Sequence, residues 1–202
     1  MIHLHTLGDT LIQVGTRSVR PTSPLMFAAL LYLGMERGRR VPRAALQEVL
    51  FSNGDERSGA HSLRQLLYKL RQLRAPIEAD AGTVFVAEED VRDDATSDLV
   101  LERDVGQLAS GFLPDYHPDL SERFTEWLDR QRDAVAASIR TRLVSAIEAS
   151  REALDWRAVE RHARLLQALD PYNEVGVFAR AESAAMSGGK TAALRILDQY
   201  QS

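Results

Sequence analysis

The sequence contains no cysteine, which excludes disulfides, thiolate metal sites and cysteine nucleophiles. It also lacks any apolar run of about eighteen residues, and no basic segment is followed by an apolar one, so we expect neither a membrane span nor a secretory leader. These absences favour a cytoplasmic protein. The hydrophobic fraction of 45% over 202 residues is enough to bury a sizeable core, in one large domain or two ordinary ones.

The common catalytic strings are absent as well, since neither Gly-x-Ser-x-Gly nor His-Glu-x-x-His occurs. His3 and His5 alternate on an expected strand, but the sequence offers no third metal ligand, so solvent-facing histidines are favoured. Nothing in the sequence places the acidic pairs in a pocket, and we expect caps and loop charges at Asp93 with Asp94 and at Asp115 with Asp119. We therefore expect no enzyme, no cofactor and no metal.

The string "GGKT" at residues 188–191 is similar to the end of a phosphate-binding loop. Such a loop requires a glycine five residues before Gly189, where this chain has Ala184, and it follows a buried strand, where this chain has the helical stretch "FARAESAAM". We therefore predict a corner between two helices rather than a nucleotide site, because glycine is favoured just beyond a helix C-terminus.

The net charge of -4 hides an asymmetry between the two ends of the chain. Residues 17–74 carry eleven Arg and Lys against four Asp and Glu, a net charge of +7. Residues 91–202 carry fourteen basic and nineteen acidic residues, a net charge of -5. A basic N-terminal part and an acidic C-terminal part indicate two separate roles.

The N-terminal part predicts strands, then three helices, then a hairpin. The opening "MIHLHTLGDTLIQVGTRSVRP" alternates apolar and polar residues, as short antiparallel strands do. A helix is expected from a capping Ser23 to near Gly38, a second over "VPRAALQEVLF", and a third over "AHSLRQLLYKLRQL", with a loop at "SNGDERSG" between the last two. After a break at Ala75 and Pro76, a hairpin is expected around Asp80 to Gly82.

The third helix separates into two faces when residues are placed about 100° apart. One face holds leucines: Leu63, Leu66, Leu67, Leu70 and Leu73. The other holds polar residues flanked by two cations: His61, Arg64, Gln65, Tyr68 and Gln72, with Lys69 and Arg71 beside them. A solvated helix face is the simpler interpretation of such a stripe.

The neighbouring segments favour DNA binding. Basic helices followed by a hairpin are typical of a winged helix, whose last helix enters the major groove. Arg64 is suited to guanine and Gln65 to adenine, while His61, Tyr68 and Gln72 lie within the same stripe. The remaining cations are expected to neutralise phosphates rather than read bases: Arg57, Lys69, Arg71, Arg39, Arg40 and Arg43.

The C-terminal part predicts helices almost throughout. A short helix is expected before Gly111 and Pro114, a long amphipathic one from Ser121 to Glu152, and then helices over residues 156–169, 173–186 and from 188 onward. An offset of 34 residues places Trp156 opposite Lys190 and Ala158 opposite Ala192, which is the tetratricopeptide period. The alternative is an unrelated helix pair of the same length.

Several motifs together resemble one family. They are "LHTLGDTLIQVGTRSV", "AALLYLGMERGRRVPRAALQEVLF", "SDL", "SGFLPDY", Trp127 with Arg130 and Arg132, "ALDPYNE" and "SGGKTAALRILDQY". The chain resembles bacterial antibiotic-regulatory-protein (SARP) transcriptional activators, in which a response-regulator-type winged helix precedes a helical bacterial transcriptional activator domain. The resemblance implies binding to promoter repeats and recruitment of RNA polymerase, with residues 60–73 as recognition helix and 78–85 as wing.

The expected protein is thus mainly α. A winged helix-turn-helix of a small antiparallel sheet, three helices and a wing hairpin occupies residues 1–94, and an α-helical tetratricopeptide-like domain occupies 95–202, expected to be truncated at its C-terminus. The expected function is sequence-specific regulation of transcription on double-stranded DNA. Its possible protein partners are RNA polymerase, a second copy of the chain or a C-terminal sensor domain. The alternative is a protein-interaction scaffold whose winged helix has lost DNA binding.

Overall fold

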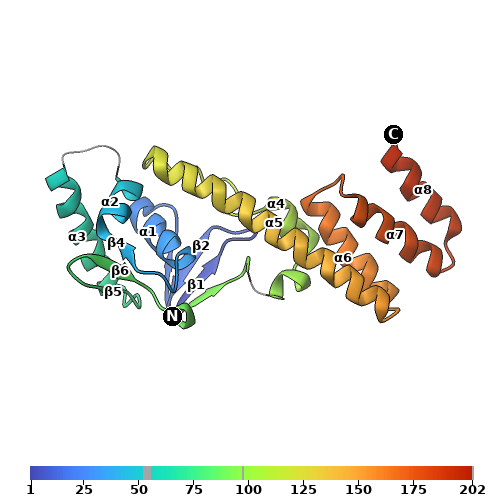
Figure 1. Ribbon diagram of the computed structural model, residues 1–202, viewed down its shortest axis with the longest axis horizontal. Helices are drawn as coiled ribbons and strands as arrows, with labels where there is room; N and C mark the ends of the chain where they lie inside the picture. Colours follow the sequence, from blue (N-terminus) through green and yellow to red (C-terminus); the bar gives the residue numbers. More distant parts are fainter. Residues whose placement is uncertain (52–55, 97, 202) are drawn as a thin grey trace.

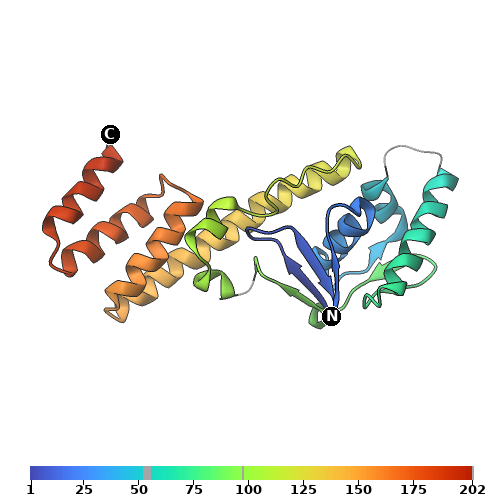
Figure 2. The same ribbon diagram turned by 180° about the vertical axis from the view of Figure 1, so that it is seen from behind.

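The computed structural model describes residues 1–51, 56–96 and 98–201, without the side chains of residues 56–58, 98, 99 and 201. The protein is mainly helical, with small sheets confined to its N-terminal part. Figures 1 and 2 show an elongated molecule, in which helix α3 lies at one end and helix α8 at the other. Across the described residues, no helix is both long and apolar enough to cross a membrane.

The first sheet has the strand order β3-β2-β1-β7. Strands β1 (Ile2–His5), β2 (Leu11–Val14) and β3 (Arg17–Val19) are antiparallel neighbours, as the alternating sequence predicts. Strand β7 (Val91–Asp93) runs parallel to β1 on its other side and was not expected from the sequence. This pairing brings residues 91–94 back to the N-terminal strand.

Three helices and a second sheet complete the N-terminal part. Helix α1 (Pro24–Met35) is followed by β4 (Val41–Pro42), α2 (Arg43–Leu50) and α3 (Glu56–Gln72). Strands β5 (Glu78–Ala79) and β6 (Thr83–Phe85) form the predicted hairpin, and β4 adds to it as a third strand.

Two local expectations in this part were wrong. Ser23 stands at the N-cap of α1, but its side chain makes no capping hydrogen bond. The loop expected over residues 52–59 is shorter, because α3 already begins at Glu56, and residues 52–55 lie outside the described part of the chain. The intrinsic preference of Ser and Gly for turns is outweighed here by continuation of the leucine-faced helix.

The C-terminal part is a run of helices, of which α5 to α8 are joined by short turns. After the 3₁₀ turns η1 (Glu88–Asp90) and η2 (Asp98–Glu102) come α4 (Val105–Ser110), α5 (Glu122–Glu152), α6 (Trp156–Leu169), α7 (Glu174–Met186) and α8 (Lys190–Gln201). The side chains of Ser121, Asp155 and Asn173 accept backbone N–H groups at the starts of α5, α6 and α7, at 3.0, 3.0 and 3.3 Å. These caps satisfy N–H donors that have no partner inside the helix.

The predicted corner at "GGKT" is present between α7 and α8. Gly188 has a φ of +85°, a left-handed conformation that glycine adopts without strain. The N–H of Gly188 donates to Ala185 at 3.0 Å and that of Gly189 to Ala184 at 2.9 Å, which closes α7. Lys190 then begins α8, so the string forms a helix junction and follows no strand.

Helix α5 connects the two parts of the molecule (Figures 1 and 2). Near its start, Phe124 is fully buried and the ring of Trp127 lies 4.9 Å from that of Tyr32 on α1. The Ser121 hydroxyl donates to the carbonyl of Val49 at 2.5 Å. Farther along, Ile139, Leu143 and Ile147 are buried, and α5 packs along α6. The hydrophobic core is therefore continuous across the predicted boundary at residues 94 and 95.

We predict that Phe124→Ala lowers the free energy of unfolding by about 3–5 kcal/mol, because it removes a fully buried ring and leaves a cavity. Urea denaturation followed by circular dichroism measures the change. Glu126→Ala, on the exposed side of the same turn, is the matched control and should cost less than about 1 kcal/mol. Equal losses in the two variants would show that α5 does not depend on this contact.

Candidate nucleic-acid interface

Helix α3 has one buried and one exposed face, as predicted. Leu63, Leu66, Leu67 and Leu70 are at most 5% exposed and belong to the core, and Leu73 is half-buried just beyond the helix end. The polar stripe on the opposite side is exposed at every predicted position that the structure describes: His61, Arg64, Gln65, Tyr68, Lys69, Arg71 and Gln72. The side chain of Arg57, also predicted to contact phosphate, lies outside the described residues.

Two residues of the predicted polar stripe contact each other. The Nε2 atoms of His61 and Gln65 are 2.8 Å apart, one helical turn along the exposed face. The Gln65 amide nitrogen donates, since an amide NH₂ group cannot accept, and the imidazole of His61 accepts in the tautomer whose Nε2 carries no proton. Tyr68, one turn further on, is 63% exposed although it is a large aromatic residue. The stripe thus offers a guanidinium, an amide, an imidazole and a phenol in two adjacent turns.

The hairpin β5–β6 is fixed beside the C-terminal end of α3. The Arg71 guanidinium donates to the carbonyl of Ala79 at 3.2 Å, and Arg17 on β3 donates to the carbonyl of Gln72 at 3.3 Å. Sequence reasoning did not single out Arg17, because a cation that caps a helix C-terminus looks like any surface arginine in the sequence. These contacts set the orientation of the helix relative to both sheets.

The turn of the hairpin is built around Asp80. Its carboxylate accepts the N–H groups of Thr83 and Gly82, at 2.6 and 2.8 Å. These backbone hydrogen bonds lower the pKa of the exposed Asp80, with Arg40 adding a smaller effect. Arg40 lies 3.7 Å from this carboxylate and 5.2 Å from the centre of the Phe85 ring. The negative charge at the hairpin tip is therefore accompanied by a cation.

The cations expected to contact phosphate thus differ in their surroundings. Arg39 pairs with Glu36 at 3.2 Å, and Arg43 is half-buried at the start of α2, with its backbone N–H donating to Gly82. Arg64 and Lys69 have no ion pair with a described carboxylate. Because an exposed pair in water is weak, the paired arginines still attract a phosphate, but less strongly than the unpaired cations.

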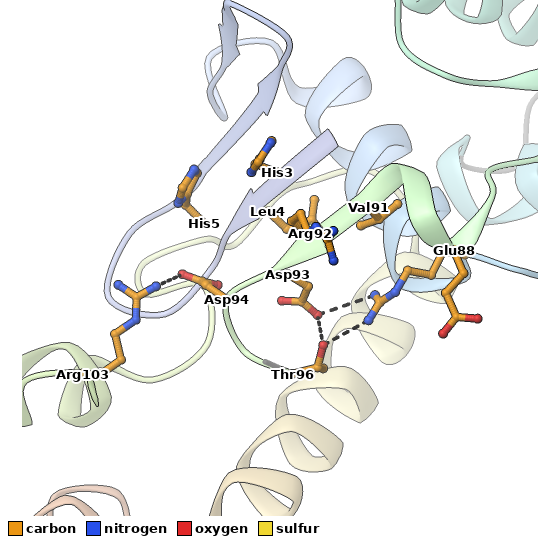
Figure 3. A pocket seen from close by; sticks show the side chains of 11 residues that line it. His3, Leu4, His5, Glu88, Val91, Arg92, Asp93, Asp94, Thr96 and Arg103 are labelled. Atoms are coloured by element: carbon orange, nitrogen blue, oxygen red, sulfur yellow. Dashed lines mark hydrogen bonds and ion pairs between the residues drawn. The ribbon is translucent and has the colours of Figure 1, made fainter. Parts of the chain in front are cut away.

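A second polar cluster lies where β7 joins β1 (Figure 3). A cleft of about 350 Å³ is lined there by His3, His5, Asp93, Asp94 and Arg103, among others. Asp93 and Asp94 are only 7% and 8% exposed. The expectation that they lie outside any pocket was wrong, because the parallel pairing of β7 with β1 carries them into the interior.

The Asp94 carboxylate ties together three segments of the chain. It accepts the N–H and the hydroxyl of Thr6, both at 2.8 Å, and the N–H of Leu7 at 3.4 Å. It also forms an ion pair with Arg103 at 2.9 Å, toward which it points in Figure 3. All of these partners stabilise the ionised carboxylate, which is the usual requirement for burying such a charge.

Asp93 points toward Thr96 rather than toward its neighbour (Figure 3). It accepts the N–H of Ala95 at 2.9 Å and the hydroxyl of Thr96 at 3.0 Å, and Arg37 on the adjacent segment lies 3.6 Å away. Burial nevertheless raises the pKa of Asp93 above its ordinary value of 3.8, because loss of hydration outweighs these contacts. Both carboxylates hold the fold together at this point.

His3 and His5 lie on the same face of β1 with their rings 6.4 Å apart, and both are half-buried rather than fully solvent-facing. Among the residues with described positions, no group of three or more His, Asp or Glu side chains is arranged to hold a metal ion. His5 instead contacts the side chain of Gln13 on β2 at 3.3 Å.

Comparisons with known proteins add nothing to this geometry. No family model matches the chain, and no curated protein matches its sequence. Its functional interpretation therefore depends on the residues and their arrangement.

We predict that Asp93→Asn becomes more stabilising, relative to the parent protein, as pH rises from about 3.5 to 7. A raised folded-state pKa means that the folded protein holds the Asp93 proton more tightly than the unfolded chain does. The stabilisation that this proton gives to the folded parent protein is fully present below pH 3.8 and is lost as the pH rises through the folded-state pKa. Asparagine does not titrate, so the variant does not show this loss. Urea denaturation of both proteins across this range measures the difference, and a trend of opposite sign would contradict the raised pKa.

Proposed function

We propose that the protein is a sequence-specific DNA-binding regulator of transcription, most simply an activator, of the type that its motifs resemble. In this proposal residues 1–94 act as a winged helix, with α3 as the recognition helix and the β5–β6 hairpin as the wing. The observation that carries the proposal is the exposed polar stripe of α3, rigidly supported by buried leucines and lying at one end of the molecule beside the hairpin.

The dimensions of α3 suit a major groove. Its 17 residues span about 25 Å at the usual rise, and the groove is about 12 Å wide, enough to admit one helix. Arg64 offers two parallel N–H donors for the N7 and O6 atoms of guanine, and Gln65 offers both a donor and an acceptor for adenine. The contact between His61 and Gln65 holds the amide close to the helix until a base replaces the imidazole.

The helical half supports the second part of the proposal, a tetratricopeptide-like domain that contacts protein partners. Helices α5 to α8 pack each against the next along the chain. Helix α6 begins at Trp156 and α8 at Lys190, so the 34-residue offset relates the first residues of two helices. RNA polymerase, a second copy or a C-terminal sensor domain are the partners that this arrangement suits.

A protein-interaction scaffold is the second candidate, and two observations favour it. Arg39 and Arg40 pair with the protein's own carboxylates, which reduces the positive charge available for phosphate. Tyr68 is 63% exposed in the centre of the stripe, and exposed tyrosines are frequent anchors of protein interfaces. Under this alternative the same face of α3 would bind a protein.

Binding to random duplex DNA is expected to weaken steeply with salt. If α3 and its surroundings engage about three to five phosphates, the log-log slope of affinity against salt concentration should be about -2.7 to -4.5. Fluorescence anisotropy with a labelled duplex, at increasing potassium chloride, measures this slope. No retention of DNA at the lowest salt concentration would favour the scaffold.

Arg64→Ala is expected to weaken binding to the selected cognate site by about 1–3 kcal/mol and to relax the preference at one base pair. The fold should be unaffected, since Arg64 is exposed. Arg195→Ala, an equal change of charge on α8 at the opposite end of the molecule, is the matched control and should bind normally. The cognate site comes from selection of bound sequences in a random pool. An unchanged preference in Arg64→Ala would remove this residue from the base-contacting set.

A further inference from the structure

A groove of about 550 Å³ lies between α4, α6 and α7, in the helical half and away from α3. Part of its lining is apolar: Val105, Trp156 and Leu165. Val105 is 47% exposed, which is unusual for a valine in the first turn of a helix that packs against another. The size of the groove falls within the range of small-molecule sites, which commonly form between helices.

The rest of the lining is rich in arginine. Arg157, Arg161 and Arg164 are spaced four and three residues apart, so they share one face of α6, and Arg103 adds a cation from the segment before α4. The acidic lining residues are Asp104 and Glu160, which leaves a net charge of +2. An acidic half of the chain therefore contains a locally positive groove.

The two carboxylates are already engaged. Glu160 pairs with Arg164 at 2.6 Å and with Arg180 at 3.4 Å. Asp104 accepts the N–H of Gln107 at 2.9 Å as the N-cap of α4. Each therefore has an established role within the protein itself.

Arg157 and Arg161 carry the unbalanced charge. Among the described residues, neither guanidinium lies within ion-pair distance of a carboxylate. The Arg161 guanidinium lies 3.4 Å from Nε2 of the buried His162. Burial, and to a smaller extent the proximity of this guanidinium, lowers the pKa of His162 and favours the neutral imidazole. Arg157 and Arg161 are thus two exposed cations, without a described carboxylate partner, beside an apolar surface.

We propose that this groove binds a small organic anion, with a flat apolar body against Trp156 and Val105 and a carboxylate, phosphate or sulfonate group against Arg157 and Arg161. Guanidinium groups bind such oxyanions through paired hydrogen bonds, and an indole provides a flat apolar surface for a ring. Ser183 fixes the geometry of this wall, because its hydroxyl donates to the carbonyl of Trp156 at 2.7 Å. The site is independent of the proposed DNA contacts.

Arg103 is shared between this groove and the polar cluster at β7. It lines both this groove and the cleft that holds Asp94, with which it pairs at 2.9 Å. Asp94 in turn holds the end of β1 through Thr6 and Leu7. A ligand in the groove therefore lies in a site that shares one residue with the Asp94 cleft.

Titration with 1-anilinonaphthalene-8-sulfonate tests the site, since this probe combines an aromatic body with one anionic group. We expect saturable binding of one probe per chain, seen as a rise in probe fluorescence. The double variant Arg157→Gln with Arg161→Gln should bind at least about tenfold more weakly, because it removes both charge-assisted contacts. The uncharged analogue N-phenyl-1-naphthylamine should bind both proteins equally.

The matched control is Arg130→Gln with Arg195→Gln, which removes the same charge from exposed positions elsewhere and should bind the probe normally. Circular dichroism verifies that each variant is folded. Unchanged probe affinity in the groove variant, or loss of binding on Leu194→Ser at the exposed apolar surface of α8, would overturn the proposal. Arginine-dependent binding of hexaglutamate without binding of the sulfonate would also overturn it, in favour of an acidic protein segment.

Discussion

The packing of helix α5 against both parts of the molecule is the constraint on which the remaining structure depends. Near its start, the ring of Phe124 lies 5.3 Å from that of Trp127 and 6.5 Å from that of Tyr116, which in turn contacts Phe27 on α1. Arg132 adds a hydrogen bond to the carbonyl of Tyr116 at 2.7 Å. The later turns of α5 pack along α6. One rigid helix thus fixes where the helical half begins and in which direction it extends.

This arrangement leaves opposite ends of the molecule free for different partners. Because α5 runs away from α3, the helices that follow α5 lie toward the other end of the molecule (Figures 1 and 2). The charge distribution follows the same division, with a net +7 over residues 17–74 and a net -5 over residues 91–202. A duplex at one end would therefore not be repelled at close range by the acidic helices, since screening in physiological salt acts over about 8 Å.

The structural features that could be predicted from the sequence are those that depend on residue spacing within one segment. The long amphipathic helix α5, the leucine face of α3 and the corner at Gly188 all follow from spacing within a single segment, and all are present. Strand β7 was not predicted, because its partner β1 lies some 90 residues away and parallel pairing leaves no turn signal. For the same reason burial of Asp93 and Asp94 was missed. The α4–α6–α7 groove and the pairing of Arg39 and Arg40 also depend on distant contacts that one sequence does not reveal.

The buried carboxylates of Asp93 and Asp94, where β7 pairs with β1, show that the position of a residue in the fold matters more than its type. Two adjacent aspartates in a loop would be hydrated and interchangeable, but here Asp94 binds backbone and hydroxyl groups of β1 while Asp93 binds the turn that follows β7. A partly buried ion pair such as Asp94 with Arg103 contributes little net stability once desolvation is counted, but it constrains the relative placement of the two segments that it joins. The pair therefore joins the segment before α4 to the end of β1, in addition to the packing of α5.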